Sequence, residues 1–109
     1  MTGKAVVPRA RASRDIEEAA DHDLREAGER IALGFIGEVE RVFGAIARNP
    51  GAGSPRYAHE LDLPGLRGRL LKRYPYSVFY VERDDHIDVW RVLHARRDIP
   101  GWMQDLERS

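Results

Sequence analysis

The sequence predicts an α+β fold in which a two-helix hairpin packs on a small antiparallel sheet. Residues 13–48 carry apolar side chains at helical spacing. Three segments after residue 65 have the length and apolar content of strands. A short apolar segment at residues 4–9 indicates one more strand before the helices. The predicted order is therefore strand, helix, helix and a three-stranded antiparallel meander.

The N-terminal segment is expected to pass from a strand into the first helix. Pro8 suits an edge strand or a strand end, because proline donates no backbone hydrogen bond. Ser13 is predicted to cap the first helix, and the acidic residues after it favour the positive end of the helix dipole. Gly28 is expected to separate the two helices. The apolar stripe of the first helix comprises Ile16, Ala19, Ala20 and Leu24.

The second helix has the stronger apolar pattern, with large side chains every three or four residues. It is predicted to end at Asn49-Pro50-Gly51, because proline cannot continue a helix. Since the connection between the helices is short, residues 13–48 should form an antiparallel hairpin. The apolar residues of this helix are Ile31, Phe35, Val39, Val42, Phe43 and Ile46.

Three strands are predicted next, at residues 66–73, 76–83 and 87–94. The unbroken apolar run at residues 78–81 is typical of a central strand that is covered on both faces. Asp84-Asp85 should form the hairpin turn. The tail, residues 98–109, carries Ile99, Trp102 and Leu106 at helical spacing. Trp102 either covers the sheet or anchors on a partner.

Composition indicates one soluble domain over residues 1–109, with 42% apolar and 33% charged residues. The absence of cysteine favours a reducing compartment, and no apolar stretch suggests a signal peptide or a membrane span, so we expect a cytoplasmic protein. Residues 13–48 hold 5 Lys/Arg and 9 Asp/Glu, whereas residues 65–97 hold 8 and 4. This asymmetry indicates either a functional basic face or simple solvation with internal pairing.

Neither a cofactor nor a metal site is expected. No glycine-rich phosphate loop follows a strand, and the four histidines lack metal-ligand spacing with one another. His94 ends the last strand and precedes Arg96 and Arg97. It either serves acid–base chemistry on phosphates, with Arg91 as a further candidate, or forms a structural hydrogen bond at the strand end.

Arginines concentrate on the first strand of the predicted meander. By alternation, Arg67, Arg69 and Arg73 should share one face of that strand. Such a face can bind phosphates or carboxylates through bidentate hydrogen bonds. Alternatively, the arginine stems cover apolar surface while the charged heads remain in water.

Three sequence strings resemble the ParE branch of the RelE/ParE toxin superfamily: LPGLR at residues 63–67, RYPYSVFY at 73–80 and IDVWRVLHARRDI at 87–99. The N-terminal half resembles the family in its element order. The resemblance implies a bacterial type II toxin, encoded beside an antitoxin that binds and neutralises it, with a helical hairpin on a small antiparallel sheet.

The resemblance to the ParE branch implies a protein that inhibits DNA gyrase by binding, with no catalytic residues and no sequence-specific DNA contact of its own. The implied partner is a ParD-like antitoxin in a hetero-oligomer, whose tail would dock on the hairpin and sheet. Candidate binding residues are Arg67, Arg69, Arg73, Arg96, Arg97 and Trp102. Two alternatives remain. One is a RelE-type ribosome-dependent endoribonuclease that uses His94, Arg91, Arg67 and Glu60. The other is a non-toxic relative that still binds antitoxin.

Overall fold

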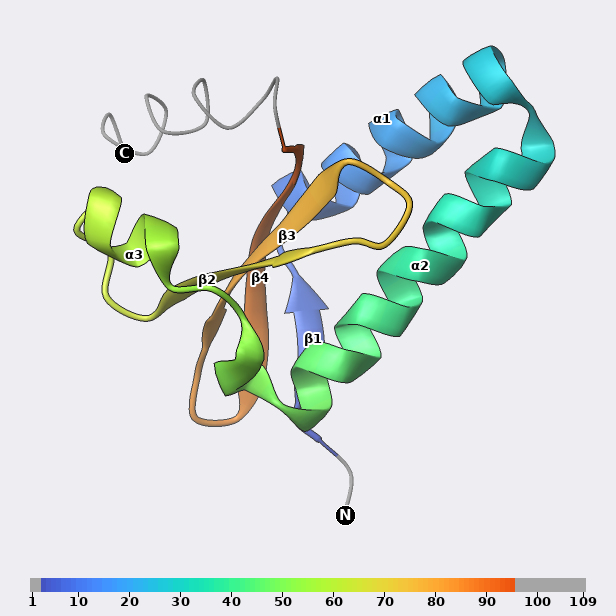
Figure 1. Cartoon of the computed structure of the whole chain (residues 1–109). Coiled ribbons are helices and arrows are strands. Elements are labelled where there is room, and N and C mark those ends of the chain that lie inside the picture. Colours follow the sequence, from blue (N-terminus) through green and yellow to red (C-terminus); the bar gives the residue numbers. More distant parts are fainter. Residues whose placement is uncertain (1–2, 96–109) are drawn as a thin grey trace.

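The computed structural model describes residues 3–95, which form a helical hairpin on one side of a four-stranded sheet and a short helix on the other (Figure 1). The sheet has the order β1-β4-β3-β2. This arrangement confirms the predicted element order. The elements are β1 (Ala5–Pro8), α1 (Ala10–Ala27), α2 (Glu29–Arg48), the 3₁₀ turn η1 (Pro50–Ala52), α3 (Arg56–Glu60), β2 (Leu66–Leu70), β3 (Tyr76–Glu82) and β4 (His86–His94).

The sheet is mixed, because β1 joins it in parallel. Ala5 lies opposite His86 and Pro8 lies opposite Val89, so the N-terminal strand pairs with the last one. The other pairs, β2 with β3 and β3 with β4, are antiparallel as predicted for the meander. The expectation of a wholly antiparallel sheet is therefore wrong for β1 alone, whose direction no local pattern encodes.

The two helices are joined by a single residue, Gly28, whose φ of 95° is readily adopted only by glycine. Its N–H reaches back to the carbonyls of Asp23 and Leu24 and so closes the last turn of α1. The predicted cap at Ser13 is wrong, because α1 already begins at Ala10. Arg9 donates its N–H to the Val89 carbonyl as the last bond of the β1 region, and the helix starts directly after it.

The strand β2 ends at Leu70, three residues earlier than predicted. Arg73 has a φ of 69°, which is incompatible with a strand and belongs to the turn that leads into β3. The predicted shared strand face of Arg67, Arg69 and Arg73 is therefore wrong for Arg73. The bounds of β3 and β4 agree with prediction to within one residue.

Two apolar clusters lie on the two faces of the sheet. Under the hairpin, Phe35, Val39, Val42 and Ile46 of α2 pack on inward-facing residues of β3 and β4. On the outer face, α3 and the loop after it cover a smaller cluster. The strand β3 is buried on both faces, as its apolar run predicts. The outer cluster consists of Leu66, Phe79, Val81 and Leu93, with Tyr57, Ala58, Leu61, Leu63 and Trp90 around it.

The pairing of β3 with β4 is interrupted by a β-bulge. Phe79 lies opposite Arg91 and Tyr80 lies opposite Val89, so Trp90 is an extra residue in β4. The bulge lies just past the end of β1, and it redirects the side chains of the strand's second half. Within residues 3–95, no helix has the length and hydropathy needed to cross a membrane.

Candidate interaction surface

Arg91 is held by an aspartate of α1. Its guanidinium donates to both carboxylate oxygens of Asp15, at 2.8 and 3.0 Å, and both side chains are nearly excluded from water. Asp15 also accepts the N–H of Val92 at 3.1 Å. Since β1 stops opposite Val89, this edge of β4 has no strand partner beyond that point. The Asp15 carboxylate accepts there the Val92 N–H, a backbone hydrogen bond that a neighbouring strand would otherwise accept. The ion pair of Asp15 with Arg91 therefore has a structural role, because it joins α1 to the sheet.

His94 lies at the end of β4, as predicted, and packs against the aromatic core. It is opposite Tyr76, with the two ring centroids 5.4 Å apart and the planes at 75°. Tyr76 in turn contacts the buried ring of Phe35 from α2. The imidazole therefore lies edge-to-face with Tyr76, which in turn contacts Phe35, and such ring contacts stabilise the end of the strand.

The four residues suggested for an endoribonuclease do not form one cluster. Arg67 lies opposite Tyr80, which is four residues along β3 from the partner of His94, a separation of about 13 Å. The Arg67 guanidinium donates to the Gly53 carbonyl at 2.8 Å, on the loop after α2. Glu60 pairs with Arg56 within α3. Arg67, Glu60 and Arg91 thus each have a separate structural partner.

A second carboxylate, Asp88, organises the outer face of the sheet. It accepts hydrogen bonds from Arg9 at 2.9 and 3.0 Å, from Arg83 at 3.0 Å and from the Trp90 indole at 3.0 Å. The Arg9 guanidinium also lies 4.6 Å from the Trp90 ring centre, within cation–π distance. Burial raises the pKa of Asp88, but these hydrogen bonds outweigh it and lower the pKa to about 2.

The sequence gives no local signal for Asp15 or Asp88 as structural residues. Asp15 looks like one of several acids in the first turns of a helix, and Asp88 looks like the polar member of an alternating strand. Their partners lie 76 and 79 positions away, Arg91 for Asp15 and Arg9 for Asp88. Only the parallel pairing of β1 with β4 brings these residues together.

The remaining basic residues of β2 and the turn after it are open to partners. Arg67 and Arg69 share a face of β2, opposite Tyr80 and Val78, and Arg73 follows in the exposed turn. Within residues 3–95, neither Arg69 nor Arg73 forms an ion pair or a side-chain hydrogen bond. The candidates Arg96, Arg97 and Trp102, like the rest of the predicted tail, lie outside the described residues.

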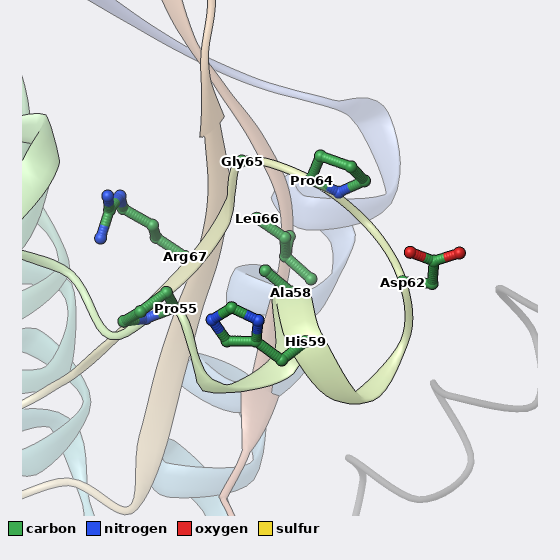
Figure 2. Close-up of a pocket in the computed structure, with 8 residues that line it drawn as sticks. All are labelled: Pro55, Ala58, His59, Asp62, Pro64, Gly65, Leu66 and Arg67. Carbon is green, nitrogen blue, oxygen red and sulfur yellow. The ribbon is translucent and has the colours of Figure 1, made fainter.

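A pocket of about 380 Å³ lies between α3, the loop after it and the start of β2 (Figure 2). Figure 2 shows that the guanidinium of Arg67 points away from the His59 ring and that the Asp62 carboxylate lies on the far side of the loop. The pocket is therefore mainly apolar, with one imidazole and no converging set of polar groups. Its lining comprises Pro55, Ala58, His59, Asp62, Pro64, Gly65, Leu66 and Arg67.

Within the described part of the chain, no group of three or more His, Asp or Glu side chains is arranged to hold a metal ion. The chemistry that the described surface offers is that of the guanidinium and ammonium groups on β2 and its turn. Such groups recognise carboxylates and phosphates.

The fold is a helical hairpin on a small mixed sheet with β2 at one edge. A solved structure described as the chromosomal ParDE TA system from P. aeruginosa has the same fold, with a TM-score of 0.72 and 22% sequence identity. The match covers 85% of this chain and 97% of that chain. A comparison with curated proteins finds no match.

The sequence matches the family described as ParE toxin of type II toxin-antitoxin system, parDE, over residues 6–99. The chain therefore belongs to the ParE toxin family, which confirms the resemblance seen in the sequence strings. The family assigns it to the toxins of type II toxin–antitoxin systems.

Proposed function

We propose that this toxin acts by binding DNA gyrase, and that a ParD-like antitoxin neutralises it in the cytoplasm. Membership of the ParE family supports the toxin class and the type of partner. The observation that favours binding over catalysis is the ion pair between Arg91 and Asp15. An arginine whose Nε and Nη2 both donate to a buried carboxylate is a poor candidate for stabilising a phosphorane.

The antitoxin is proposed to dock an acidic, amphipathic tail along β2 and the neighbouring hairpin, in a hetero-oligomer. Arg69 and Arg73 have no partner within residues 3–95 and can pair with carboxylates of the tail. Leu70 lies between them with 61% of its surface exposed and offers an apolar contact. A tail that orders on binding covers such an extended surface despite its entropic cost. Arg96, Arg97 and Trp102 remain proposed contributors.

Expression without antitoxin tests the target. DNA synthesis should stop before protein synthesis, and cells should filament. Purified toxin should cause cleaved DNA to accumulate with gyrase and ATP. Early arrest of translation, with messenger RNA cut on the ribosome, would overturn the gyrase proposal in favour of the endoribonuclease. Normal growth beside intact antitoxin binding would identify a non-toxic relative.

Charge reversal tests the antitoxin surface. The double variant Arg69→Glu/Arg73→Glu should lose affinity for the cognate antitoxin in a pull-down. Arg67→Glu is less informative alone, because it also breaks the bond to the Gly53 carbonyl. Arg25→Glu, at an exposed position near the end of α1, is the matched control and should bind normally. Unchanged affinity of the double variant would remove β2 from the proposed interface.

A further inference from the structure

A second pocket, of about 330 Å³, lies between the middle of α2 and the turn that joins β2 to β3. The helix contributes Gly34, Glu38 and Arg41, and the turn contributes Lys72, Arg73 and Tyr74. The Tyr74 hydroxyl donates to the Ile31 carbonyl, which ties the turn to the helix. Three cationic side chains and one carboxylate line this pocket, and it contains no aliphatic side chain.

The carboxylate of this pocket is already fully engaged. Glu38 accepts two hydrogen bonds from Arg41, at 2.7 and 2.8 Å, and the backbone N–H of Lys72 at 2.5 Å. The Arg41 hydrogen bonds, together with the Lys72 N–H, lower the pKa of Glu38 to about 2. Glu38 therefore neutralises Arg41 and fixes the turn, and the Lys72 ammonium and the Arg73 guanidinium form no ion pair within residues 3–95.

Arg73 occupies a backbone conformation that usually selects glycine. Its φ is 69°, in the left-handed region, and it is an exposed residue. Outside glycine, the only other described residue with positive φ is Asp62, a type that tolerates this region well. A long cationic side chain at a strained position indicates that the side chain itself is used, since strain of this kind concentrates at binding sites.

We propose that this pocket binds a backbone phosphate of nucleic acid, independently of base sequence, through Lys72 and Arg73. Two unpaired cations beside a neutralised pair give the mouth of the pocket a net positive charge. Each phosphate that a cation neutralises releases condensed counterions, a gain that the densely charged backbone of nucleic acid provides. An acidic peptide that contacts this pocket alone would gain little, because exposed ion pairs are weak and the lining offers no aliphatic contact, whereas the proposed antitoxin tail also contacts β2.

This inference goes beyond gyrase inhibition and does not depend on it, because it concerns the toxin and nucleic acid alone. It also gives Arg73 two successive partners. An antitoxin tail that pairs with Arg73 would cover the phosphate site in the neutralised complex.

The test is binding of purified toxin to a short fluorescent duplex DNA, followed by fluorescence anisotropy over a range of salt concentrations. Two unrelated base sequences should bind alike. Lys72→Ala and Arg73→Gly should each weaken binding to both duplexes and reduce the slope of log affinity against log salt by about one. Lys72→Ala keeps the backbone N–H that Glu38 accepts, so the turn remains fixed.

Two control variants separate charge from structure. Asp62→Gly relieves the other positive-φ residue and should leave DNA binding at or above the level of the parent. Arg25→Ala removes an exposed cation from the far end of α1 and should leave the salt slope unchanged. Arg73→Gly should also unfold no earlier than the parent on heating, which would show that its loss of binding is not a loss of fold.

Three outcomes would overturn the proposal. The first is that the parent toxin binds neither duplex, the second is that Arg25→Ala reduces binding as much as Arg73→Gly, and the third is that polyglutamate of matched charge competes as well as DNA. The last result would reassign the pocket to an acidic protein partner.

Discussion

The arginine of β4 and the arginines of β2 and its turn belong to one sheet region but lie in different environments. Near the end of β4, Arg91 is paired with Asp15 and nearly buried, with 13% of its side chain exposed. On β2 and its turn, Arg69 and Arg73 have no carboxylate partner within residues 3–95. The difference arises because α1 runs beside the exposed edge of β4 and supplies Asp15, whereas β2 lies at the opposite side of the sheet.

The arginines of this sequence therefore have two different roles. One kind stabilises the fold by neutralising carboxylates from distant segments. The other kind leaves the molecule with a basic edge that a partner can neutralise. Substitutions in the first region should therefore change stability, and substitutions in the second should change binding.

The largest effect is expected for Asp15→Asn. This change removes the carboxylate charge that is paired with the nearly buried Arg91 guanidinium, and it should lower the free energy of unfolding by about 3–5 kcal/mol. Urea unfolding followed by circular dichroism measures the loss. As a control, Asp15→Leu combined with Arg91→Met should recover much of the stability, because well-packed apolar residues replace a buried pair at little cost. A loss below about 1 kcal/mol in Asp15→Asn would contradict the structural role of this pair.

Acid should destabilise the second carboxylate network over a defined pH range. The folded-state pKa of Asp88 is lowered from 3.8 to about 2, so its contribution is complete above the unfolded pKa and is lost as pH falls through this range. The difference corresponds to about 2 kcal/mol. Unfolding free energies measured between neutral and acid pH should show this decrease.

Asp88→Asn should be less stable than the parent at neutral pH and should show a flatter pH profile. Glu38→Gln provides a comparison, because the pKa of Glu38 is lowered from 4.5 to about 2 and should contribute in the same range. A profile for Asp88→Asn that still falls as steeply as that of the parent would assign the acid sensitivity to other groups.

His94→Gln should have a small effect, because the glutamine amide keeps hydrogen-bonding capacity while the edge-to-face contact of the imidazole with Tyr76 is lost. The expected loss is about 1 kcal/mol or less, and toxicity in a growth assay should be retained. A general acid or base would instead lose on the order of a hundredfold in rate. A non-toxic variant with parental stability would therefore favour the endoribonuclease.

The smallest change in stability is expected for Arg69→Ala, at about 0.5 kcal/mol or less, because this side chain has no hydrogen bond within residues 3–95. Thermal unfolding measures the difference from the parent. The same variant should bind antitoxin more weakly, which would confirm that β2 and β4 differ as described. A large stability loss would instead place Arg69 among the structural arginines.

Much of the fold could be predicted from the sequence, because helical spacing and apolar runs reflect local geometry. The hairpin and the three strands of the meander agree with those patterns. The sequence does not mark the early end of β2, because Leu71 and the basic residues after it continue the apolar and basic composition of the strand into the turn. The start of α1 was missed, because Ser13 offered a good cap and the actual boundary depends on the bond from Arg9 to β4.

The candidate site was predicted only in part. The basic character of β2 follows from composition, but the commitment of Arg91 to Asp15 depends on a bulge at Trp90 and on where β1 ends. The pocket beside Arg73 requires a left-handed backbone in a segment that the pattern assigned to a strand. These features depend on tertiary contacts between residues far apart in the chain.

The pairing of β1 with β4 has a consequence for synthesis of the toxin. Ala5 lies opposite His86, so β1 can pair in the sheet only after β4 has been synthesised. Likewise, Asp15 can pair with Arg91, and Arg9 with Asp88, only after β4 has been synthesised. A growing chain that has not yet released β4 from the ribosome has a hairpin without a sheet beneath it. The polypeptide therefore completes its four-stranded sheet only after β4 has left the ribosome.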